Sequence, residues 1–312
     1  MANWTEREDD NYLGLLFLIG AYQTPFLNMI GGLDGARSKV VTSFSFPTSQ
    51  PWSLTAASQP NISEDTSVAA GTATTVTRSQ VLNTVQIFQE TVEVSYAKQS
   101  TFGEISGLSA IGNQPVSDEM AFQRRAALKQ IAIDADFTFM QGAYVASSTP
   151  SGDTAPRSRG MLTAISTSEV AAAAADLTKA MVNELMKKMA EAGAVFENMV
   201  LFCNAFQKQA ISDIYGYAPE NRTVGGVNIQ QIYTDFAPLG VVYTPNIPTD
   251  DILIADMNYC YPVFCPVPGK GLLFYEDLAQ NAASIRGQMY GQIGLDHGPE
   301  NYHGKVTNLS VS

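Results

Sequence analysis

The chain of 312 residues is 45% hydrophobic and only 15% charged, which gives enough apolar material for a sizeable core and a thinly charged surface. We therefore expect two lobes that share strands, with much of the surface facing other protein. The formal net charge of -12, from 18 basic and 30 acidic residues, excludes a protein that holds duplex DNA by neutralising its phosphates, although an acidic wall can still enclose DNA.

The cysteines and the N-terminal segment indicate a reducing compartment. Cys203, Cys260 and Cys265 all lie in apolar runs, which favours buried thiols over a disulfide framework. Residues 6–10 are mostly acidic where a secretory signal needs positive charge, and the apolar run 13–22 is too short to span a bilayer. We expect a cytosolic protein with no membrane partner.

Residues 1–37 are predicted to form an N-terminal arm. Two short apolar patches, 15–19 and 25–30, follow the acidic start of the chain, and Gly31 and Gly32 close the second patch. Such patches need a surface that covers them, either on the body of the same chain or on a neighbouring molecule.

Residues 40–100 are predicted to form a long two-stranded excursion. Hydrophobic alternation predicts an outgoing strand over 40–46, which Pro47 bounds. The return strand, over 85–96, changes the parity of its alternation, so we expect a bulge near Gln89.

The stretch between these two strands, residues 55–79, is rich in Ser and Thr. It has too few large apolar residues to bury a core of its own. We expect a long loop, and loops of this length in compact proteins are usually functional or disordered.

Residues 117–141 give the strongest helix signal. Ser117 or Asp118 can cap its start and Gly142 can end it. At 1.5 Å per residue the helix is about 36 Å long, so we expect a spine on which other elements lie. Apolar residues recur along it at helical spacing: Ala121, Leu128, Ile131, Ala132, Ala135 and Phe139.

The second half of the chain is predicted to be a compact α+β lobe. After a polar linker over 147–160, a helix is expected to start at Asp176 and to stop at Gly193. Asn204 is expected to cap another helix that runs to Tyr215. Strands are expected at 199–203, 227–233, 239–243, 252–255, 259–265 and 272–275, with tail strands over 284–295 and 306–311.

A search for a chemical site finds little. The two histidines suggest a metal site made of Asp296, His297, Glu300 and His303, but their spacing fits no standard ligand signature, and a hydrogen-bonded polar turn is the alternative. The glycine pairs lack the lysine of phosphate loops, and no nucleophile elbow occurs. We therefore expect no catalytic, cofactor-binding or metal-binding residues, no cofactor, and no enzymatic activity.

The order of these parts resembles the major capsid proteins of tailed phages with the Hong Kong 97-type fold. Three stretches are similar to one branch of that family: residues 23–27 with Gly31 and Gly32, residues 91–95, and residues 298–306. The resemblance implies an α+β fold with an N-terminal arm at 1–39, an extended loop at 40–104, a peripheral domain at 105–175 and 280–312 that contains the spine helix 117–141, and an axial domain at 176–279.

The resemblance also implies the partners. The chain is expected to assemble with itself into hexamers and pentamers, and the extended loop to lie over a neighbouring subunit. The shell would enclose DNA without sequence-specific binding, belong to the virion and assemble in the host cytoplasm. Separate scaffold, portal and cement proteins are expected partners; the scaffold is expected to be separate because the chain starts almost at the arm. No lysine lies between Lys39 and Lys98, so a lysine cross-link from the loop is excluded.

Three other readings stay open. An encapsulin, a cellular shell that encloses an enzyme, would keep the fold and change the contents. A metal-dependent hydrolase would centre on His297 and His303. A surface-layer or adhesion protein would suit the stretches rich in Ser and Thr, although the missing export signal argues against it.

Overall fold

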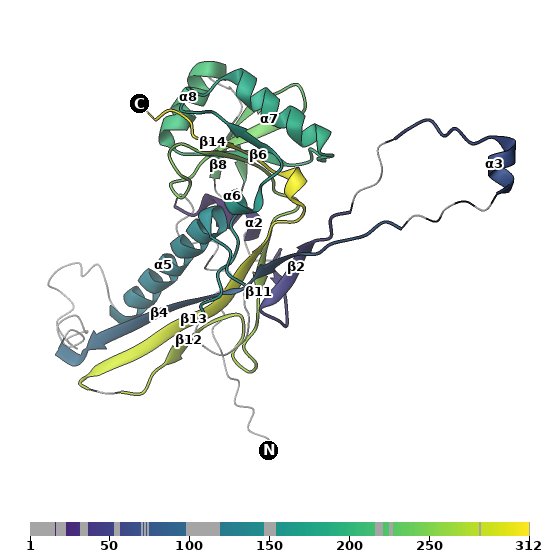
Figure 1. Cartoon of the computed structure of the whole chain (residues 1–312). Helices are drawn as coiled ribbons and strands as arrows, with labels where there is room; N and C mark the ends of the chain where they lie inside the picture. The colour runs from purple at the N-terminus through teal and green to yellow at the C-terminus, as the bar shows by residue number, and fades with distance from the viewer. Residues whose placement is uncertain are drawn as a thin grey trace.

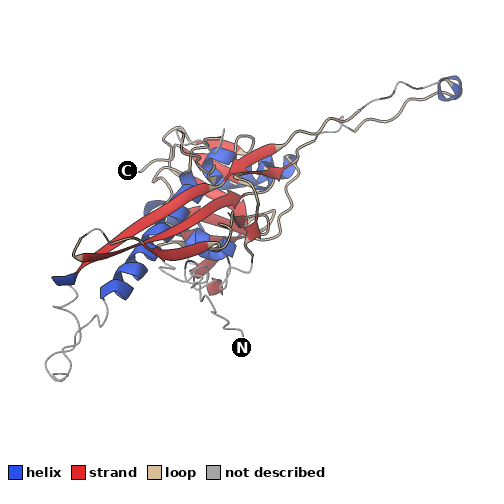
Figure 2. Cartoon of the chain, turned by 90° about the horizontal axis from the view of Figure 1, so that it is seen from below, coloured by secondary structure: helices blue, strands red, loops and turns tan. Residues whose placement is uncertain are grey.

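The computed structural model describes residues 16, 23–31, 37–52, 57–69, 71, 73, 75–97, 119–146, 154–215, 221–224, 227–280 and 282–311. Two sheets and one long helix make the body, and a thin two-stranded excursion reaches far away from it (Figure 1). Seen from below, the long strands of one sheet run beside the long helix, and the excursion again lies apart from the body (Figure 2). The body is therefore a mixture of helix and sheet, as the sequence predicts.

The first sheet has five strands, and its centre is the long strand β13. One edge of β13 pairs with β4, antiparallel and in unbroken register from Ser284–Ser95 to Ile293–Gln86. The other edge pairs with β12 and then with β11, to which β1 adds in parallel. The bounds are β1 Lys39–Val40, β4 Gln86–Ser95, β11 Tyr261–Phe264, β12 Leu273–Asp277 and β13 Ser284–Asp296.

Helix α5 (Glu119–Gln141) lies along this sheet (Figure 1) and confirms the predicted spine. Its end is also confirmed, because the N–H of Gly142 donates to the carbonyl of Thr138 at 2.8 Å. The expected caps, Ser117 and Asp118, lie outside the described residues. Its buried apolar residues recur at helical spacing: Met120, Ala127, Leu128, Ile131, Ala132, Ala135, Phe139 and Met140.

Helix α2 (Pro25–Gly31) shows where the second apolar patch of the arm goes. All seven of its residues are buried, and the ring of Phe26 packs edge-on against Phe202 with centroids 5.4 Å apart. This patch therefore packs on the body of its own chain. Of the first patch only Leu16 is described, and it is buried in the same core.

The second sheet has seven strands in the order β5-β14-β10-β6-β9-β8-β7. It carries the helices α7 and α8 (Figure 1), while the short helix α6 precedes β5 in the chain. The strands are β5 Glu169–Ala171, β6 Met199–Cys203, β7 Asn221–Val224, β8 Val227–Tyr233, β9 Pro238–Tyr243, β10 Ile252–Asp256 and β14 Gly304–Thr307. The helices are α6 Met161–Ala164, α7 Lys179–Glu191 and α8 Ala205–Tyr215, and a 3-10 turn spans Glu300–Tyr302.

The division of strands between the two sheets corrects one expectation. Strands β11 and β12 were expected in the lobe of β6, but they pair in the five-stranded sheet. Strands β5 and β14 join the seven-stranded sheet instead. The chain thus passes from the seven-stranded to the five-stranded sheet and back. The strands that pair are far apart in the sequence, so local sequence patterns do not predict this pairing.

The excursion also differs from the expected strand pattern. The outgoing strand is two strands, β1 and β2 (Ser45–Ser49), separated by a bend. Pro47 lies inside β2, which tolerates it because β2 pairs only with β3 (Val81–Thr84). The bulge expected near Gln89 is wrong: the parity changes at Val85, where the chain leaves β3 for β4 and donates to the carbonyl of Phe44.

Two helix boundaries test the expected capping residues. Helix α7 starts at Lys179 rather than at Asp176, because the side chain of Thr178 is the cap and accepts the N–H of Met181 at 3.3 Å. It ends before Gly193, as expected, and Gly193 has a φ of 83°.

The other boundaries follow the same rules. Asn204 caps α8 as predicted, since its Oδ1 accepts the N–H of Gln207 at 3.0 Å. The last strand was expected over 306–311 but spans Gly304–Thr307, and Asn308 ends it with a φ of 56°.

We predict that Gly142→Ala strongly destabilises the chain. A Cβ at this position would collide with the backbone oxygens of Thr138 and Ser158, which cannot move without breaking the end of α5. We expect the free energy of unfolding in urea to fall by about 2 kcal/mol or more. Gly71→Ala is the matched control, because nothing lies within 4 Å of a Cβ there, and equal stability of the two variants would contradict the prediction.

Candidate functional site

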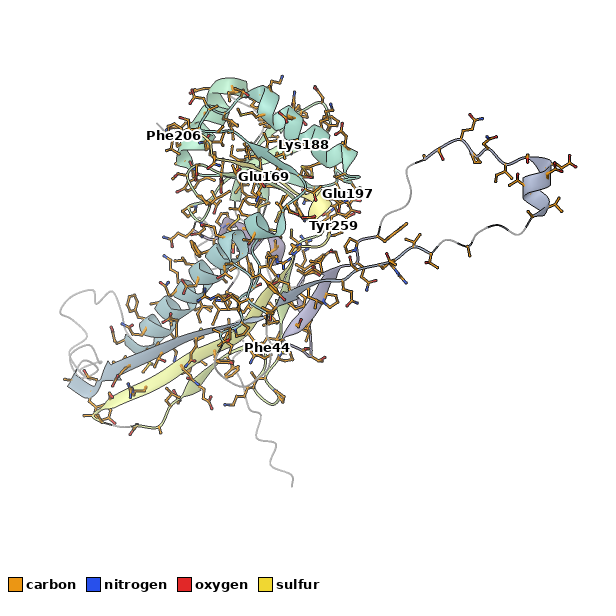
Figure 3. The ribbon with its side chains drawn as sticks, viewed as in Figure 1. Phe44, Glu169, Lys188, Glu197, Phe206 and Tyr259 are labelled. Atoms are coloured by element: carbon orange, nitrogen blue, oxygen red, sulfur yellow. The ribbon has the colours of Figure 1, made fainter. Side chains whose placement is uncertain are left out.

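The exposed end of the excursion is the first candidate functional surface. Its short helix α3 (Glu64–Val68) is capped by Ser63, whose Oγ accepts the N–H of Thr66 at 3.2 Å. The apolar side chains Ile62 and Val68 are 68% and 84% exposed. Figure 3 shows that the side chains of this end have no other part of the chain beside them. Such apolar exposure on an ordered helix indicates a surface for another molecule.

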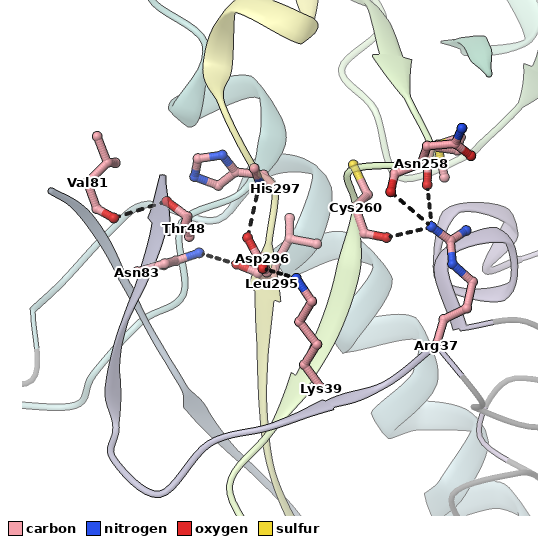
Figure 4. Close-up of polar contacts among 12 residues, drawn as sticks. Arg37, Lys39, Thr48, Val81, Asn83, Asn258, Cys260, Leu295, Asp296 and His297 are labelled. Atoms are coloured by element: carbon pink, nitrogen blue, oxygen red, sulfur yellow. Dashed lines mark hydrogen bonds and ion pairs between the residues drawn. The ribbon is translucent and has the colours of Figure 1, made fainter. Parts of the chain in front are cut away.

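The root of the excursion, by contrast, is firmly bonded to the body. The buried side chain of Asn83 donates through Nδ2 to the carbonyls of Leu295, at 2.6 Å, and Arg159, at 3.2 Å. Its Oδ1 accepts the N–H of Arg159 at 2.7 Å, and Thr48 Oγ1 donates to the carbonyl of Val81 (Figure 4). The root therefore holds the direction in which the excursion leaves the body.

Two cations attach the end of the arm at the same place (Figure 4). Arg37 donates to the carbonyl of Met257 at 2.7 Å, and Lys39 forms an ion pair with Asp296 at 2.7 Å. Both cations also lie over the ring of Tyr261, at 4.9 and 3.9 Å from its centroid. The arm and the excursion root thus meet where β13 ends.

His303 joins two of the stretches of chain that cross between the sheets. Its Nδ1 accepts the N–H of Asp256 at 3.2 Å, and its Nε2 lies 2.6 Å from the carbonyl oxygen of His297. Because Nδ1 accepts, Nε2 carries the proton and donates to that carbonyl. The imidazole is neutral, since burial lowers its pKa to about 4.

The four residues of the suspected metal site do not form one. Both ring nitrogens of His303 bond to the backbone, Asp296 pairs with Lys39, and the carboxylate of Glu300 accepts hydrogen bonds from Ser166 and Thr167. Only the ring of His297 lacks a hydrogen-bond partner. Within the described ranges, no group of three or more His, Cys, Asp or Glu side chains could hold a metal ion. The geometry is that of the polar-turn alternative.

Asp136 is a buried structural residue that sequence reasoning missed. It is fully buried on α5, where Oδ1 accepts the N–H of Leu27 at 2.8 Å and Oδ2 accepts from Asn246 at 2.7 Å. Burial raises its pKa to about 7, although both hydrogen bonds favour the charged form. The carboxylate holds α2 against the spine. Its position between Ala135 and Phe139 on the apolar face was the available signal.

The chain matches a family model described as "SU10 major capsid protein" over residues 2–310. No curated protein matches the chain. No helix in the described part of the chain combines the length and apolar character that crossing a membrane requires.

Several solved structures are similar to the chain in fold. The capsid asymmetric unit of cyanophage A-1(L) is 10% identical, with 93% of each chain covered and a TM-score of 0.66. The holo-SrpI encapsulin complex from Synechococcus elongatus PCC 7942 is 12% identical, covering 88% of this chain and 86% of that one, with a TM-score of 0.57. The capsid of the native GTA particle is 14% identical, with 92% and 91% covered and a TM-score of 0.55. The expected α+β capsid fold of the Hong Kong 97 type is confirmed.

We predict that Asp136→Ala loosens the arm from the spine. The substitution leaves the N–H of Leu27 and the amide of Asn246 buried without their acceptor, so the free energy of unfolding should fall by about 3 kcal/mol. Asp134→Ala is the control on the same helix, where the carboxylate accepts only from exposed Gln130. It should cost less than about 1 kcal/mol in the same urea titration, and equal losses would contradict the assigned role.

We predict that His303 makes the chain less stable in acid. The unfolded imidazole binds a proton below its ordinary pKa of 6.5, whereas the folded one stays neutral until about pH 4, so its contribution is complete above 6.5 and is lost as the pH falls. Relative to His303→Gln, the native chain should lose about 2 kcal/mol of unfolding free energy between pH 7.5 and 5.0.

The comparison with His303→Gln cancels other groups. Asp136 acts in the opposite sense, because its raised pKa makes the folded state more stable as the pH falls. A difference between native chain and variant that stays constant over this pH range would contradict a neutral, buried His303.

Proposed function

Because the chain belongs to the SU10 major capsid protein family, it is a major capsid protein of a viral particle, and we propose that its copies close into the icosahedral head of a tailed bacterial virus. The observation that supports this proposal best is the excursion, whose end exposes Ile62 and Val68 with no covering surface among the described residues of its own chain. Closed shells are built from such contacts repeated under symmetry. A family of shell subunits is structural, and we propose no enzymatic activity.

We propose that the two sheets have different roles in the shell. We propose that the seven-stranded sheet with α7 and α8 acts as the axial domain and meets its copies around five-fold and six-fold centres in pentamers and hexamers. This sheet covers only part of the expected range 176–279, because β11 and β12 pair in the other sheet and β5 and β14 join from outside the range. The spine helix and the five-stranded sheet correspond to the expected peripheral domain. Residues 1–39 would be the arm, and 40–104 the loop that lies over a neighbouring subunit.

We propose that the shell encloses DNA without binding its sequence. The net charge of -12 supports this, since an acidic wall repels packed phosphates. All three cysteines are free and buried, as is usual for proteins that fold where thiols stay reduced, and this supports assembly in the host cytoplasm. Separate scaffold, portal and cement proteins remain predictions.

A second candidate keeps the fold and changes the contents. The similarity to the SrpI encapsulin supports a cellular shell that would enclose an enzyme. Particles purified from the producing cells separate the two proposals. DNase-protected DNA or a portal protein in the particles supports a virus, whereas a copurified enzyme supports an encapsulin.

We predict that the excursion is needed for assembly and not for folding. In the test variant, a short Gly-Ser linker replaces residues 53–77, so that the bridge between Trp52 and Arg78 is kept. The free energy of unfolding should stay within about 1 kcal/mol, because every described residue that is removed is exposed and loop shortening has a small effect. Negative-stain electron microscopy should show hollow shells from the native chain and none from the variant.

Two outcomes would contradict the proposal. Normal shells from the shortened variant would show that the excursion is not an inter-subunit contact. A native chain that stays monomeric under all salt conditions, even with coexpressed phage assembly proteins, would contradict the shell itself.

A further inference from the structure

A fully buried carboxylate attaches the arm helix α2 to the spine helix α5, beside which it lies (Figure 1). This carboxylate, that of Asp136, accepts the N–H of Leu27 at 2.8 Å and the Nδ2 of Asn246 at 2.7 Å. No charged side chain in the described part of the chain acts on it. Neutral donors alone therefore replace the water that the carboxylate loses on burial.

Asn246 extends this attachment to the start of α2. Its Nδ2 donates to Asp136 and also to the carbonyl of Gln23, at 3.0 Å. The carbonyl of Thr24 accepts the N–H of Asn28, which closes the turn. One carboxylate and one amide thus hold the first turn of the arm helix on the body.

A second polar group makes the docked position of α2 costly. Asn28 is only 2% exposed, and neither its Oδ1 nor its Nδ2 has a hydrogen-bond partner. The fully buried side chains of Phe26, Leu27 and Ile30 favour docking. The unpaired amide opposes them, because water would bond it once α2 left the spine. Docked and released positions therefore differ by less free energy than the buried apolar area alone would give.

The chain beyond α2 has its own anchor. Arg37 donates to the carbonyl of Met257 at 2.7 Å, and Lys39 pairs with Asp296 at 2.7 Å. Neither bond involves α2 or the carboxylate beneath it. The sheets can therefore stay folded while α2 moves, which is a local opening.

A proton on Asp136 changes the balance between the two positions of α2. Burial raises the pKa of the docked Asp136 to about 7. Hydrogen bonds from Asn246, Leu27 and Phe26 lower this pKa by less than burial raises it. In the released position water reaches the carboxylate, and its pKa returns toward the ordinary value of 3.8. The docked position binds the proton more tightly, so release becomes easier as the pH rises from about 4 to about 7.

The elements around Asp136 bring no other charge to it. Helix α2, the turn over 244–248 and helix α6 contain no charged residue. On α5 the nearest charged residue is Asp134, whose carboxylate accepts from the exposed Gln130. Strands β4 and β13 also pack on α5, and none of their charged residues acts on the pKa of Asp136: Glu90, Glu93, Arg286 and Asp296.

We propose that Asp136 makes the attachment of the arm sensitive to pH: with a proton on this carboxyl group α2 stays on the spine, and without the proton α2 leaves more readily. Release uncovers Phe26, Leu27 and Ile30 and so presents an apolar surface that another molecule can cover. The inference concerns the single subunit and goes beyond the proposed shell function, which it does not need.

Hydrogen exchange of the full chain tests the proposal. The exchange rate of the α2 amides, divided by their intrinsic rate at each pH, gives the local opening constant. This constant should rise by at least about tenfold between pH 5.0 and 8.0. In Asp136→Asn it should not change with pH, whereas the matched control Asp134→Asn should keep the native profile. Strand β6 reports global unfolding, and its opening constant should stay far below that of α2.

Each other outcome overturns a stated part of the proposal. A native opening constant that stays flat or falls with rising pH overturns the pH sensitivity, and this measurement needs no variant. A rise that persists in Asp136→Asn assigns the effect to another group. Equal opening of α2 and β6 means that only global unfolding frees the arm. All of these outcomes leave the proposed shell function to its own assembly test.

Discussion

One hydrophobic core, which both sheets and α5 share, holds the body together, and the buried imidazole of His303 bonds two of the stretches that cross between the sheets. Besides the connection through α5 from β4 to β5, the chain crosses between the sheets twice: a first crossing lies between β10 and β11, and a second lies between β13 and β14. His303 bonds the first crossing through the N–H of Asp256 and the second through the carbonyl of His297. Since both partners are backbone groups and the site is buried, neither bond can be exchanged for water without opening the seam.

The arm and the excursion are attached to this same seam. Lys39 reaches Asp296 at the end of β13, Arg37 reaches the carbonyl of Met257 in the first crossing, and Asn83 bonds the carbonyl of Leu295. No such bond from the described part of its own chain reaches the exposed end of the excursion. A fixed root and an exposed apolar end make the excursion a projection whose burial energy becomes available only when another molecule covers it.

Local patterns predicted the local structure well. The strand Met199–Cys203 was placed correctly because an uninterrupted apolar run bounded by Asn204 fits a buried strand followed by a capped helix. The spine helix was found because its apolar residues repeat at helical spacing. The assignment of β5 and β14 to one sheet and of β11 and β12 to the other could not be predicted, because such pairing joins residues far apart in sequence.

For the candidate sites, too, some features were predictable from the sequence and others only from the fold. The exposed loop was predictable, because a stretch rich in Ser and Thr cannot bury a core. The role of Asp136 was not predictable, because its carboxylate bonds Leu27 and Asn246, which lie more than a hundred residues away in the sequence. From the sequence, the two histidines suggested a metal site. Only the fold shows that the ring of His303 bonds backbone groups and that the ring of His297 lacks a hydrogen-bond partner.

The composition of the loop determines which type of contact can hold the subunits of a shell together. Without a lysine between Lys39 and Lys98 and with all three thiols buried, the described surfaces offer noncovalent contacts. A single exposed ion pair contributes at most about 1 kcal/mol. A contact that also buries apolar side chains, such as Ile62 and Val68 at the end of the excursion, contributes more, and a closed shell repeats it in every subunit. Weak contacts of this kind let misplaced subunits leave during assembly, while their number makes the completed shell stable.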